Sequence, residues 1–197
     1  MKTGTKGEGR GARSEGRRHS RSATLTAKLR RVHLLLCDVD GVLTDATVFI
    51  GDGPEFKRFH IRDGLGLVLL QREGIKVGWV SARPSPATTK RAAELKIDFL
   101  HQEKASKSAA VEAILKQAGL TWAQVCYVGD DIVDLGALRR AGVAVAVANA
   151  IAEARTLADY VTRAPGGHGA VREVAELILK AQGKWAGLVA KYTADEA

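Results

Sequence analysis

The sequence predicts an α/β fold: a Rossmann-like three-layer α/β/α arrangement with a central parallel sheet. Short apolar runs of strand length alternate with helical patterns from Val32 onward, which is typical of βαβ units. Polar residues gather directly after several of these runs. The chain has 197 residues, 46% hydrophobic and 26% charged, which fits one globular domain with a substantial core.

The elements follow from the alternation. The predicted strands are the apolar runs Val32–Val39, Ile75–Val80, Ile97–Leu100, Val125–Val128, Val143–Val147 and Tyr160–Val161. The predicted helices lie between and after them, at Gly64–Arg72, Ser85–Leu95, Ser106–Ala118, Leu135–Ala141, Ala150–Leu157 and Ala170–Gln182. Residues 45–61 differ. Thr47–Ile50 and Glu55–His60 flank Gly51-Asp52-Gly53, which predicts a β-hairpin flap with a glycine turn, placed to cover a site after the first strand.

The charge is unevenly distributed. Residues 1–31 hold ten Lys and Arg against two Glu, so this segment accounts for the whole net charge of +8. We expect a disordered basic arm at 1–31, one domain over 32–185 and a C-terminal tail over 186–197. Because the rest is neutral, nucleic-acid binding is unlikely beyond weak contacts of the arm, and a solvated tail is the favoured interpretation.

The sequence shows neither a membrane span nor a secretory signal. No apolar run approaches the ~20 residues of a membrane span, and the basic N-terminus has no apolar secretory core. Cys37 and Cys126 lie in apolar strand runs, the expected place of reduced, buried thiols. We therefore expect a cytoplasmic protein with no membrane partner.

The most informative motif follows the first strand. The run Leu34–Asp45 places Asp38 and Asp40 at the strand end, followed by Gly41. Two carboxylates there are costly to bury unless a cation or a proton offsets them, and oxygen ligands suit Mg²⁺. Asp38 then offers a nucleophile and Asp40 a general acid and base. The alternative is a turn with chance acids.

Polar residues follow three further strands. Ser81 and Arg83 come after the second, Lys107 after the third, and the fourth leads into an acidic cluster: Asp130, Asp131 and Asp134. Ligands of open α/β sheets bind at the carboxyl ends of the strands, so these side chains should converge.

Each of these side chains has a place in phosphoryl transfer. Asp38, the backbone carbonyl of Asp40 and the side chain of Asp130 would hold Mg²⁺. Ser81 and Lys107 would bind phosphate oxygens. Asp131 would orient Lys107 or a metal-bound water, and Asp134 would do the same or cap the next helix.

This set resembles the haloacid dehalogenase superfamily, and over nearly all of 32–185 it resembles the 3-deoxy-D-manno-octulosonate 8-phosphate phosphatase family. The similar stretches are His60–Gly66, Ser81–Arg83, Gly129–Asp131, Val145–Ala148, Ala158–Thr162, Gly166–Val174 and Leu179–Lys184. The resemblance implies a capless enzyme and a homotetramer, with the hairpin packed between subunits. The substrate-binding positions that it implies are Asp40, His60, Ile61, Arg62, Asp63, Gly64, Arg83, Arg91 and Lys107.

Several of these positions have plainer interpretations. A bidentate guanidinium suits a sugar-acid carboxylate, but Arg91 also fits a solvated helix face. Arg62 and Asp63 also fit local ion pairing and helix capping. Gly166–Gly169 is a secondary site, either a phosphate-cradling loop or a hinge, and its His168 fits a surface residue.

The chain departs from the family pattern at four positions. His60 replaces a usual asparagine, Ala46 and Ala82 replace common glycines, and Glu103 lies near Lys107. The sequence predicts a Mg²⁺-dependent phosphatase of 3-deoxy-D-manno-octulosonate 8-phosphate in lipopolysaccharide precursor synthesis. The alternatives are a phosphatase of a nine-carbon sialic or deaminosialic acid phosphate, or a non-catalytic phosphatase-like binding module. A mutase would need a cap, for which the chain has no room.

Overall fold

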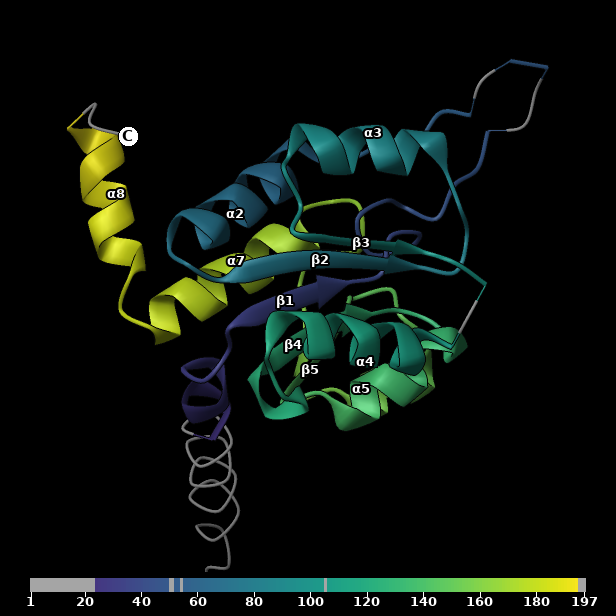
Figure 1. The fold of residues 1–197 in the computed structure, drawn as a ribbon. Coiled ribbons are helices and arrows are strands. Elements are labelled where there is room, and N and C mark those ends of the chain that lie inside the picture. Colours follow the sequence, from purple (N-terminus) through teal and green to yellow (C-terminus); the bar gives the residue numbers. More distant parts are fainter. Residues whose placement is uncertain (1–23, 50–51, 54, 105, 195–197) are drawn as a thin grey trace, which may run out of the picture.

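A six-stranded sheet forms the centre of the molecule (Figure 1). The computed structural model describes residues 24–49, 52–53, 55–104 and 106–194. All strand pairs are parallel, in the order β3-β2-β1-β4-β5-β6. The strands are β1 (Leu34–Cys37), β2 (Lys76–Ser81), β3 (Phe99–Gln102), β4 (Val125–Gly129), β5 (Val143–Ala146) and β6 (Tyr160–Val161). Every predicted strand is present; β6 has the predicted bounds, and one or both ends of each of the others are shifted by one or a few residues.

Helices cover both faces of the sheet, which confirms the three-layer prediction (Figure 1). One face carries α2 (Ile61–Arg72), α3 (Pro86–Glu94) and α7 (Ala170–Ala181). The other carries α4 (Lys107–Ala118) and α5 (Leu135–Arg140), with α6 (Ala152–Leu157) packed beside α5. Two short 3₁₀ turns, η1 (Trp122–Gln124) and η2 (Ile132–Asp134), flank β4. Within the described ranges, no helix combines the length and apolar character that a bilayer crossing requires.

The core explains why β1 forms at the centre. All four of its residues are fully buried, and their registers place Cys37 beside Trp79 of β2 and Val128 of β4. Trp79 is itself fully buried and stacks on Phe59, with ring centroids 5.9 Å apart. Cys37 and Cys126 are free and buried, as predicted, and burial raises the pKa of both thiols. The carboxyl end of β1 is thereby fixed between two neighbouring strand ends.

The described segments 24–31 and 185–194, near the two ends of the chain, are more ordered than predicted. Residues 24–29 are helical, Leu29 is buried, and Lys28 lies 2.6 Å from Asp159. The basic arm predicted over 1–31 is therefore wrong for 24–31, because an apolar side chain in this segment reaches the core; residues 1–23 lie outside the described part. The predicted tail over 186–197 contains α8 (Trp185–Thr193), which buries Leu188 against the rest.

The predicted hairpin over 45–61 has no strand in its described residues. Phe49 and Phe56 are 63% and 66% exposed, so the segment buries little apolar surface of its own. A two-stranded ribbon without a packed face is marginal in water, which explains why alternating residues alone do not form the ladder. Ile50, Gly51 and Pro54 lie outside the described residues.

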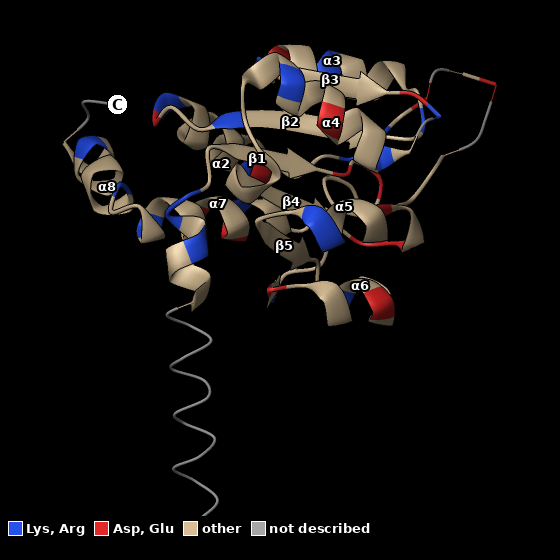
Figure 2. Cartoon of the chain, turned by 60° about the horizontal axis from the view of Figure 1, so that its bottom comes forward, with Lys and Arg blue, Asp and Glu red and all other residues tan. Residues whose placement is uncertain are grey.

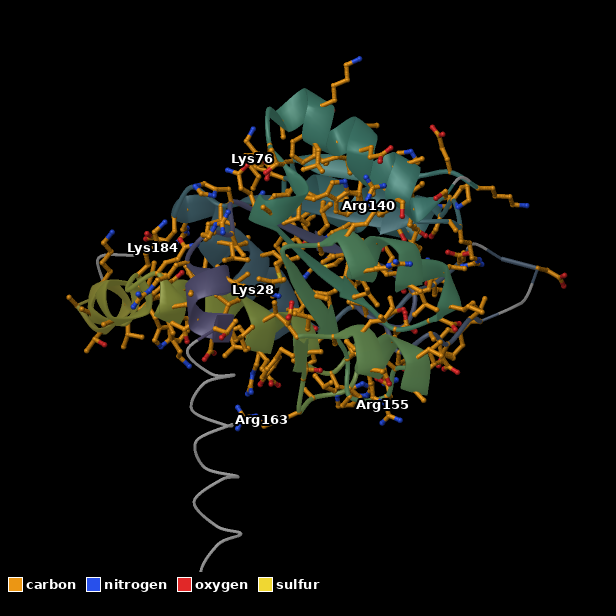
Figure 3. The ribbon with its side chains drawn as sticks, turned by 90° about the horizontal axis from the view of Figure 1, so that it is seen from below. Lys28, Lys76, Arg140, Arg155, Arg163 and Lys184 are labelled. Atoms are coloured by element: carbon orange, nitrogen blue, oxygen red, sulfur yellow. The ribbon has the colours of Figure 1, made fainter. Side chains whose placement is uncertain are left out.

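Charges on the domain are interspersed. In Figure 2, blue and red segments alternate over the helices on both faces of the sheet. The basic side chains labelled in Figure 3 come from well-separated parts of the chain, including Lys28, Lys76 and Arg140.

Candidate active site

Asp38 is the first residue after β1, and three contacts fix it. Its backbone N–H donates to the Val128 carbonyl at 3.0 Å, which continues the β1–β4 ladder by one bond. Its Oδ1 accepts the Val39 N–H at 2.7 Å, and its Oδ2 lies 2.7 Å from Lys107 Nζ. The side chain is 8% exposed, so the carboxylate is held at the edge of the core with one face open.

Lys107 lies between two carboxylates. It begins α4, its side chain is 3% exposed, and its Nζ is 2.7 Å from both Asp38 and Asp134. Opposite charges on both sides raise the pKa of Lys107 against the effect of burial, so it stays an ammonium. Asp134 is fully buried and also accepts the Tyr127 hydroxyl at 2.8 Å.

Asp134 has a positioning role. Its Oδ1 serves Lys107 and Tyr127, and its Oδ2 accepts the N–H groups of Asp130 at 3.0 Å and Asp131 at 3.2 Å. The predicted contact with Lys107 is present, whereas the predicted cap of the following helix is wrong: Asp134 occupies the N-cap position of α5, but its side chain makes no capping hydrogen bond there and instead closes the turn at η2. Asp131 does not take the first of its two predicted roles, the orientation of Lys107, and the role beside a metal-bound water stays a prediction. Its exposed side chain accepts the neighbouring Ile132 N–H and makes no contact with Lys107, because it caps η2.

A cluster of three carboxylates points to a cation. Oxygens of Asp38, Asp130 and Asp134 lie within 4.8 Å of one another. Asp130 Oδ1 is buried without a hydrogen-bond partner in the described part of the chain. Burial, reinforced by the other carboxylates, raises the pKa of Asp38 to about 6 and that of Asp130 to about 8. Since Asp134 is fully hydrogen-bonded, Asp38 and Asp130 carry the oxygens available to Mg²⁺, and this donor set fits the ion.

Gly41 is required beside this cluster. Its φ of +98° lies in the left-handed region, and a Cβ there would lie 2.0 Å from Asp130 Oδ2. Only glycine therefore lets the loop after β1 pass so close to Asp130.

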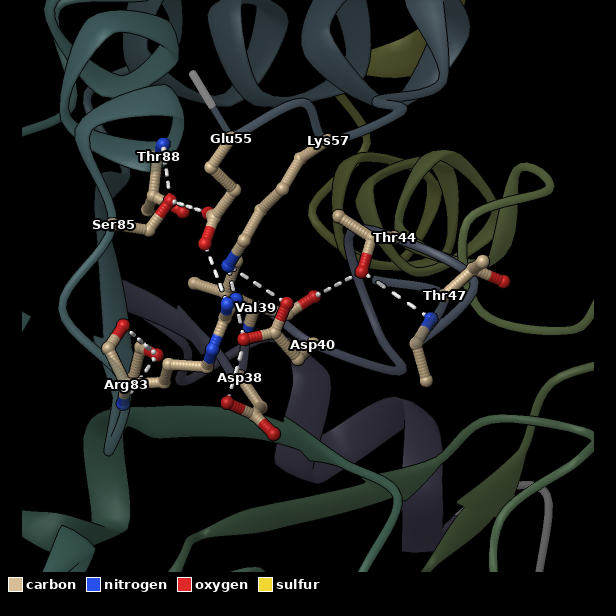
Figure 4. Close-up of polar contacts among 12 residues, drawn as sticks. Asp38, Val39, Asp40, Thr44, Thr47, Glu55, Lys57, Arg83, Ser85 and Thr88 are labelled. Atoms are coloured by element: carbon tan, nitrogen blue, oxygen red, sulfur yellow. Dashed lines mark hydrogen bonds and ion pairs between the residues drawn. The ribbon is translucent and has the colours of Figure 1, made fainter. Parts of the chain in front are cut away.

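Asp40 pairs with a lysine that the sequence analysis did not single out. Lys57 Nζ lies 2.8 Å from Asp40 Oδ1 and 3.0 Å from Oδ2 (Figure 4). The Lys57 side chain is 2% exposed, while that of Asp40 is 27% exposed and faces the open side. No periodic pattern marks Lys57; its position in the segment just after the aspartate motif was the only available signal.

Ser81 and Arg83 form a compact turn after β2. The Ser81 hydroxyl accepts the Arg83 N–H at 3.0 Å and lies 3.0 Å from the Arg83 carbonyl. The Arg83 guanidinium extends toward the space between Lys57 and the aspartates (Figure 4), where its Nη2 lies 2.5 Å from Glu55. Glu55 also accepts a short hydrogen bond from Ser85, another residue that the sequence analysis missed.

The segment His60–Gly64 lies at the start of α2. Asp63 is buried and accepts the backbone N–H groups of Arg172 at 2.7 Å and Gly169 at 3.3 Å. The predicted local cap is wrong, because α2 has His60 as its N-cap without a side-chain capping hydrogen bond, and Asp63 instead accepts N–H groups at the start of α7; burial raises the pKa of Asp63. Ile61 and Arg62 are exposed, and His60 Nδ1 lies 3.9 Å from Asp63 Oδ2.

Arg91 lies against this segment. A Cβ at Gly64 would lie 2.5 Å from its Nη2, and its Nη1 pairs with Glu94 at 2.8 Å. With 13% of its side chain exposed, Arg91 does not form the solvated face that was one interpretation. The departure at Glu103 places an exposed carboxylate 3.8 Å from His101, whereas the carboxylates that contact Lys107 are those of Asp38 and Asp134.

The two alanines that replace common glycines of the family, Ala46 and Ala82, both lie in loops. Ala46 adopts a φ of 63°, the left-handed region where the family commonly has glycine. Ala82 is half-buried in the turn between Ser81 and Arg83.

The glycine stretch Gly166–Gly169 packs on the loop after β1. A Cβ at Gly166 would lie 1.7 Å from the Gly41 carbonyl oxygen, and the Gly167 N–H donates to the Val42 carbonyl at 2.9 Å. These glycines allow close backbone packing beside the aspartate motif; the phosphate-cradle and hinge interpretations stay predictions. His168 is exposed, as expected of a surface residue, and with His60 and Arg62 it lines a cavity of about 290 Å³ beside α7 whose lining includes none of the catalytic residues.

Known proteins share this arrangement. Residues 97–173 match the haloacid dehalogenase-like hydrolase family. The chain is 41% identical over 164 residues to 3-deoxy-D-manno-octulosonate 8-phosphate phosphatase KdsC of Escherichia coli K12, covering 83% of this chain and 87% of the relative. The chain belongs to the 3-deoxy-D-manno-octulosonate 8-phosphate phosphatase family. The Haemophilus influenzae member is 42% identical over 158 residues, covering 80% and 88%.

Solved structures of this family agree with the fold. The Moraxella catarrhalis phosphatase, in complex with magnesium, phosphate and KDO, matches with a TM-score of 0.83 at 38% identity, covering 85% of this chain and 97% of that one. The cobalt-bound Haemophilus influenzae phosphatase matches with a TM-score of 0.77 at 42% identity, covering 80% and 92%. The predicted family resemblance is confirmed.

Proposed function

We propose that this protein hydrolyses 3-deoxy-D-manno-octulosonate 8-phosphate to the free sugar acid and phosphate in lipopolysaccharide precursor synthesis. It is then a Mg²⁺-dependent phosphoric monoester hydrolase. The observation that carries the proposal is the convergence of Asp38, Lys107 and Asp130 at one sheet edge in a chain with the identity to KdsC given above. An oxygen-rich site with one lysine suits phosphoryl transfer, where positioning and charge neutralisation provide most of the rate.

Two aspartates divide the covalent chemistry. A carboxylate oxygen of Asp38 attacks phosphorus, so that an aspartyl-phosphate bond forms while the bond to the sugar oxygen breaks. Asp40 protonates the leaving oxygen and then takes a proton from the water that hydrolyses the aspartyl-phosphate. The partly open side of Asp40 gives its carboxyl access to both substrate and water.

The remaining groups neutralise and position the phosphate. Lys107 Nζ binds non-bridging oxygens, and the buried Asp134 keeps that ammonium in place. Ser81 binds a further phosphate oxygen. Mg²⁺, held by Asp38, Asp130 and the backbone carbonyl of Asp40, supplies further positive charge for the transferring phosphoryl group.

The sugar acid would be bound from the α3 side. Arg83 binds the carboxylate with its planar guanidinium, and Arg91 supports the neighbouring segment. That segment contributes the remaining proposed substrate contacts, from His60, Ile61, Arg62, Asp63 and Gly64. Asp63 acts there through its cap on α7, since its carboxylate is already engaged.

Phosphate release tests the function directly. The substrates are 3-deoxy-D-manno-octulosonate 8-phosphate and the sialic acid 9-phosphates, each with Mg²⁺ and with a chelator. We expect Mg²⁺-dependent release with strong preference for the eight-carbon acid. Preference for a nine-carbon acid would keep the chemistry and change the pathway. No release from any of them would favour a binding module.

The assembly and location are further parts of the proposal. A homotetramer is supported by the exposed Phe49 and Phe56 of the 45–61 segment, which would gain burial between subunits. A cytoplasmic location is supported by Cys37 and Cys126, which are free and buried. Light scattering after gel filtration tests the tetramer. The catalytic domain is proposed to cover 32–185, extended to 24–194 by the packed termini, so deletion of residues 1–22 should leave kcat and oligomeric state unchanged.

A further inference from the structure

The carboxylate of Glu55 occupies an anion-binding position. Its Oε2 lies 2.5 Å from Arg83 Nη2, and its Oε1 accepts the Ser85 hydroxyl (Figure 4). The Glu55 side chain is 21% exposed. The Ser85 hydrogen bond, followed by the Arg83 charge, lowers the pKa of Glu55 despite its partial burial, which favours its carboxylate form. A carboxylate of this chain therefore already sits on the guanidinium.

Arg83 retains capacity for a second carboxylate. Its Nη1 is buried and has no hydrogen-bond partner among the residues that the structure describes. A guanidinium offers a fork of donors that suits both oxygens of one carboxylate, and Glu55 reaches only one terminal nitrogen of it. An incoming carboxylate that takes both terminal nitrogens would have to displace Glu55.

Lys57 keeps Glu55 within reach of Arg83. It lies two residues further along the chain, its side chain is buried, and it is paired with Asp40 beside the catalytic edge. This anchor makes the encounter of Glu55 with Arg83 intramolecular, so that Glu55 competes with a ligand at high effective concentration.

We propose that Glu55 is a specificity-determining residue: its carboxylate takes the position of the substrate carboxylate on Arg83 and Ser85, and the two exchange on binding. The proposal rests on the proposed function, which assigns the sugar-acid carboxylate to Arg83. A phosphate ester that carries a carboxylate displaces Glu55 from Arg83 and replaces that ion pair with its own. An ester without one leaves Glu55 in place or leaves a partly buried guanidinium unpaired, which is unfavourable.

The test compares the wild type with Glu55→Gln, which keeps the size of the side chain and removes its charge. With 3-deoxy-D-manno-octulosonate 8-phosphate, we expect KM to fall about fivefold, because the competing charge on Arg83 is lost. The inhibition constant of the free sugar acid should fall by a similar factor. The fall should be smaller for p-nitrophenyl phosphate, which carries no carboxylate. Glu103→Gln, at an exposed carboxylate that pairs with His101, is the matched control, with an expected KM change below about twofold.

The KM of Glu55→Gln decides whether the two carboxylates exchange on Arg83. A higher KM in Glu55→Gln would mean that Glu55 contacts the substrate, and an unchanged KM would mean that its role is structural; both overturn the exchange. If Glu55→Gln fails to fold, Glu55→Asp replaces it, since the shorter carboxylate competes less well and should also lower KM. Failure of the proposed function is separate: the wild type would then release no phosphate from any sugar acid. A preference for nine-carbon acids leaves the exchange intact, since they also carry a carboxylate.

Discussion

The catalytic edge of the sheet and the segment 45–60 lie side by side but are built differently. At the edge, Asp38, Lys107 and Asp134 are each less than a tenth exposed and are held by strand ends and one helix start. The segment has no regular structure in its described residues and is tied to the domain by Lys57 and Glu55. The proposed chemical step thus rests on buried groups at the sheet edge, while the proposed substrate selection rests on ion pairs of an irregular segment.

The pKa shifts reflect the same contrast. At the edge, burial is the dominant cause and raises the pKa of Asp38 and Asp130. In the segment, the hydroxyl of Ser85 and the charge of Arg83 lower the pKa of Glu55. The edge carries unfavourable negative charge that a cation offsets, whereas the segment is already neutralised by its own partners.

The largest effect is expected at the nucleophile. Asp38→Asn should lower kcat by at least about a thousandfold, because the amide cannot form the aspartyl-phosphate. Folding should be retained, since the substitution removes a buried charge. Phosphate release and thermal melting measure the two effects. Turnover near the wild-type rate would contradict the covalent mechanism.

Asp134→Ala tests whether the catalytic edge of the sheet also contributes to the stability of the fold. It removes four hydrogen bonds from a fully buried site and leaves Lys107 with one partner, so we expect a loss of about 3 kcal/mol in the free energy of unfolding. Denaturant unfolding measures it. Asp131→Ala, which removes one exposed cap, is the control, at about 1 kcal/mol or less. Equal losses would mean that burial does not distinguish the two aspartates.

The raised pKa values predict a pH-dependent effect of Mg²⁺. An acid whose pKa is higher in the folded chain binds its proton more tightly there, so the metal-free protein loses stability as the pH rises from about 4 through 6 and 8. Mg²⁺ replaces these protons, and its affinity should rise about tenfold or more from pH 6 to pH 8.

Melting temperatures with Mg²⁺ and with a chelator, at pH 6 and pH 8, measure this effect. The increase due to Mg²⁺ should be larger at pH 8. Asp130→Asn should remove most of the difference. The same increase at both pH values would show that Asp38 and Asp130 do not exchange protons for the ion.

The smallest effect on stability is expected in the segment. Lys57→Met keeps the buried stem and removes the pair with Asp40, whose carboxyl is partly solvated, so the free energy of unfolding should fall by less than about 1 kcal/mol. Lys57→Arg is the charge-preserving control, and denaturant unfolding measures both. A loss above about 3 kcal/mol in the free energy of unfolding would mean that the Lys57 pair contributes as much to stability as the buried carboxylates at the sheet edge, which would contradict the contrast between the two regions.

The same contrast explains what could be predicted from the sequence. The apolar runs set the strands, and a parallel sheet brings the residues after its strands together, so Asp38, Lys107 and Asp130 could be predicted. Lys57 and Glu55 could not, because their partners lie 17 and 28 residues away and follow no periodicity. Alternation over 45–61 indicated a hairpin, but it carries no information on whether a packed face exists to support it.

The turn after β1 and Asp63 reach their final packing only after Gly166 and helix α7 have been synthesised. Asp63, near the catalytic loop in sequence, caps α7 through Arg172, 109 residues further along the chain, and Gly166 packs on the turn after β1. Synthesis at ~5–20 residues per second leaves a delay on the order of ten seconds between the two. A growing chain therefore carries Asp38 for several seconds before the residues that pack on Asp63 and on the turn after β1 have been made, so we expect the site to reach its final geometry late in synthesis.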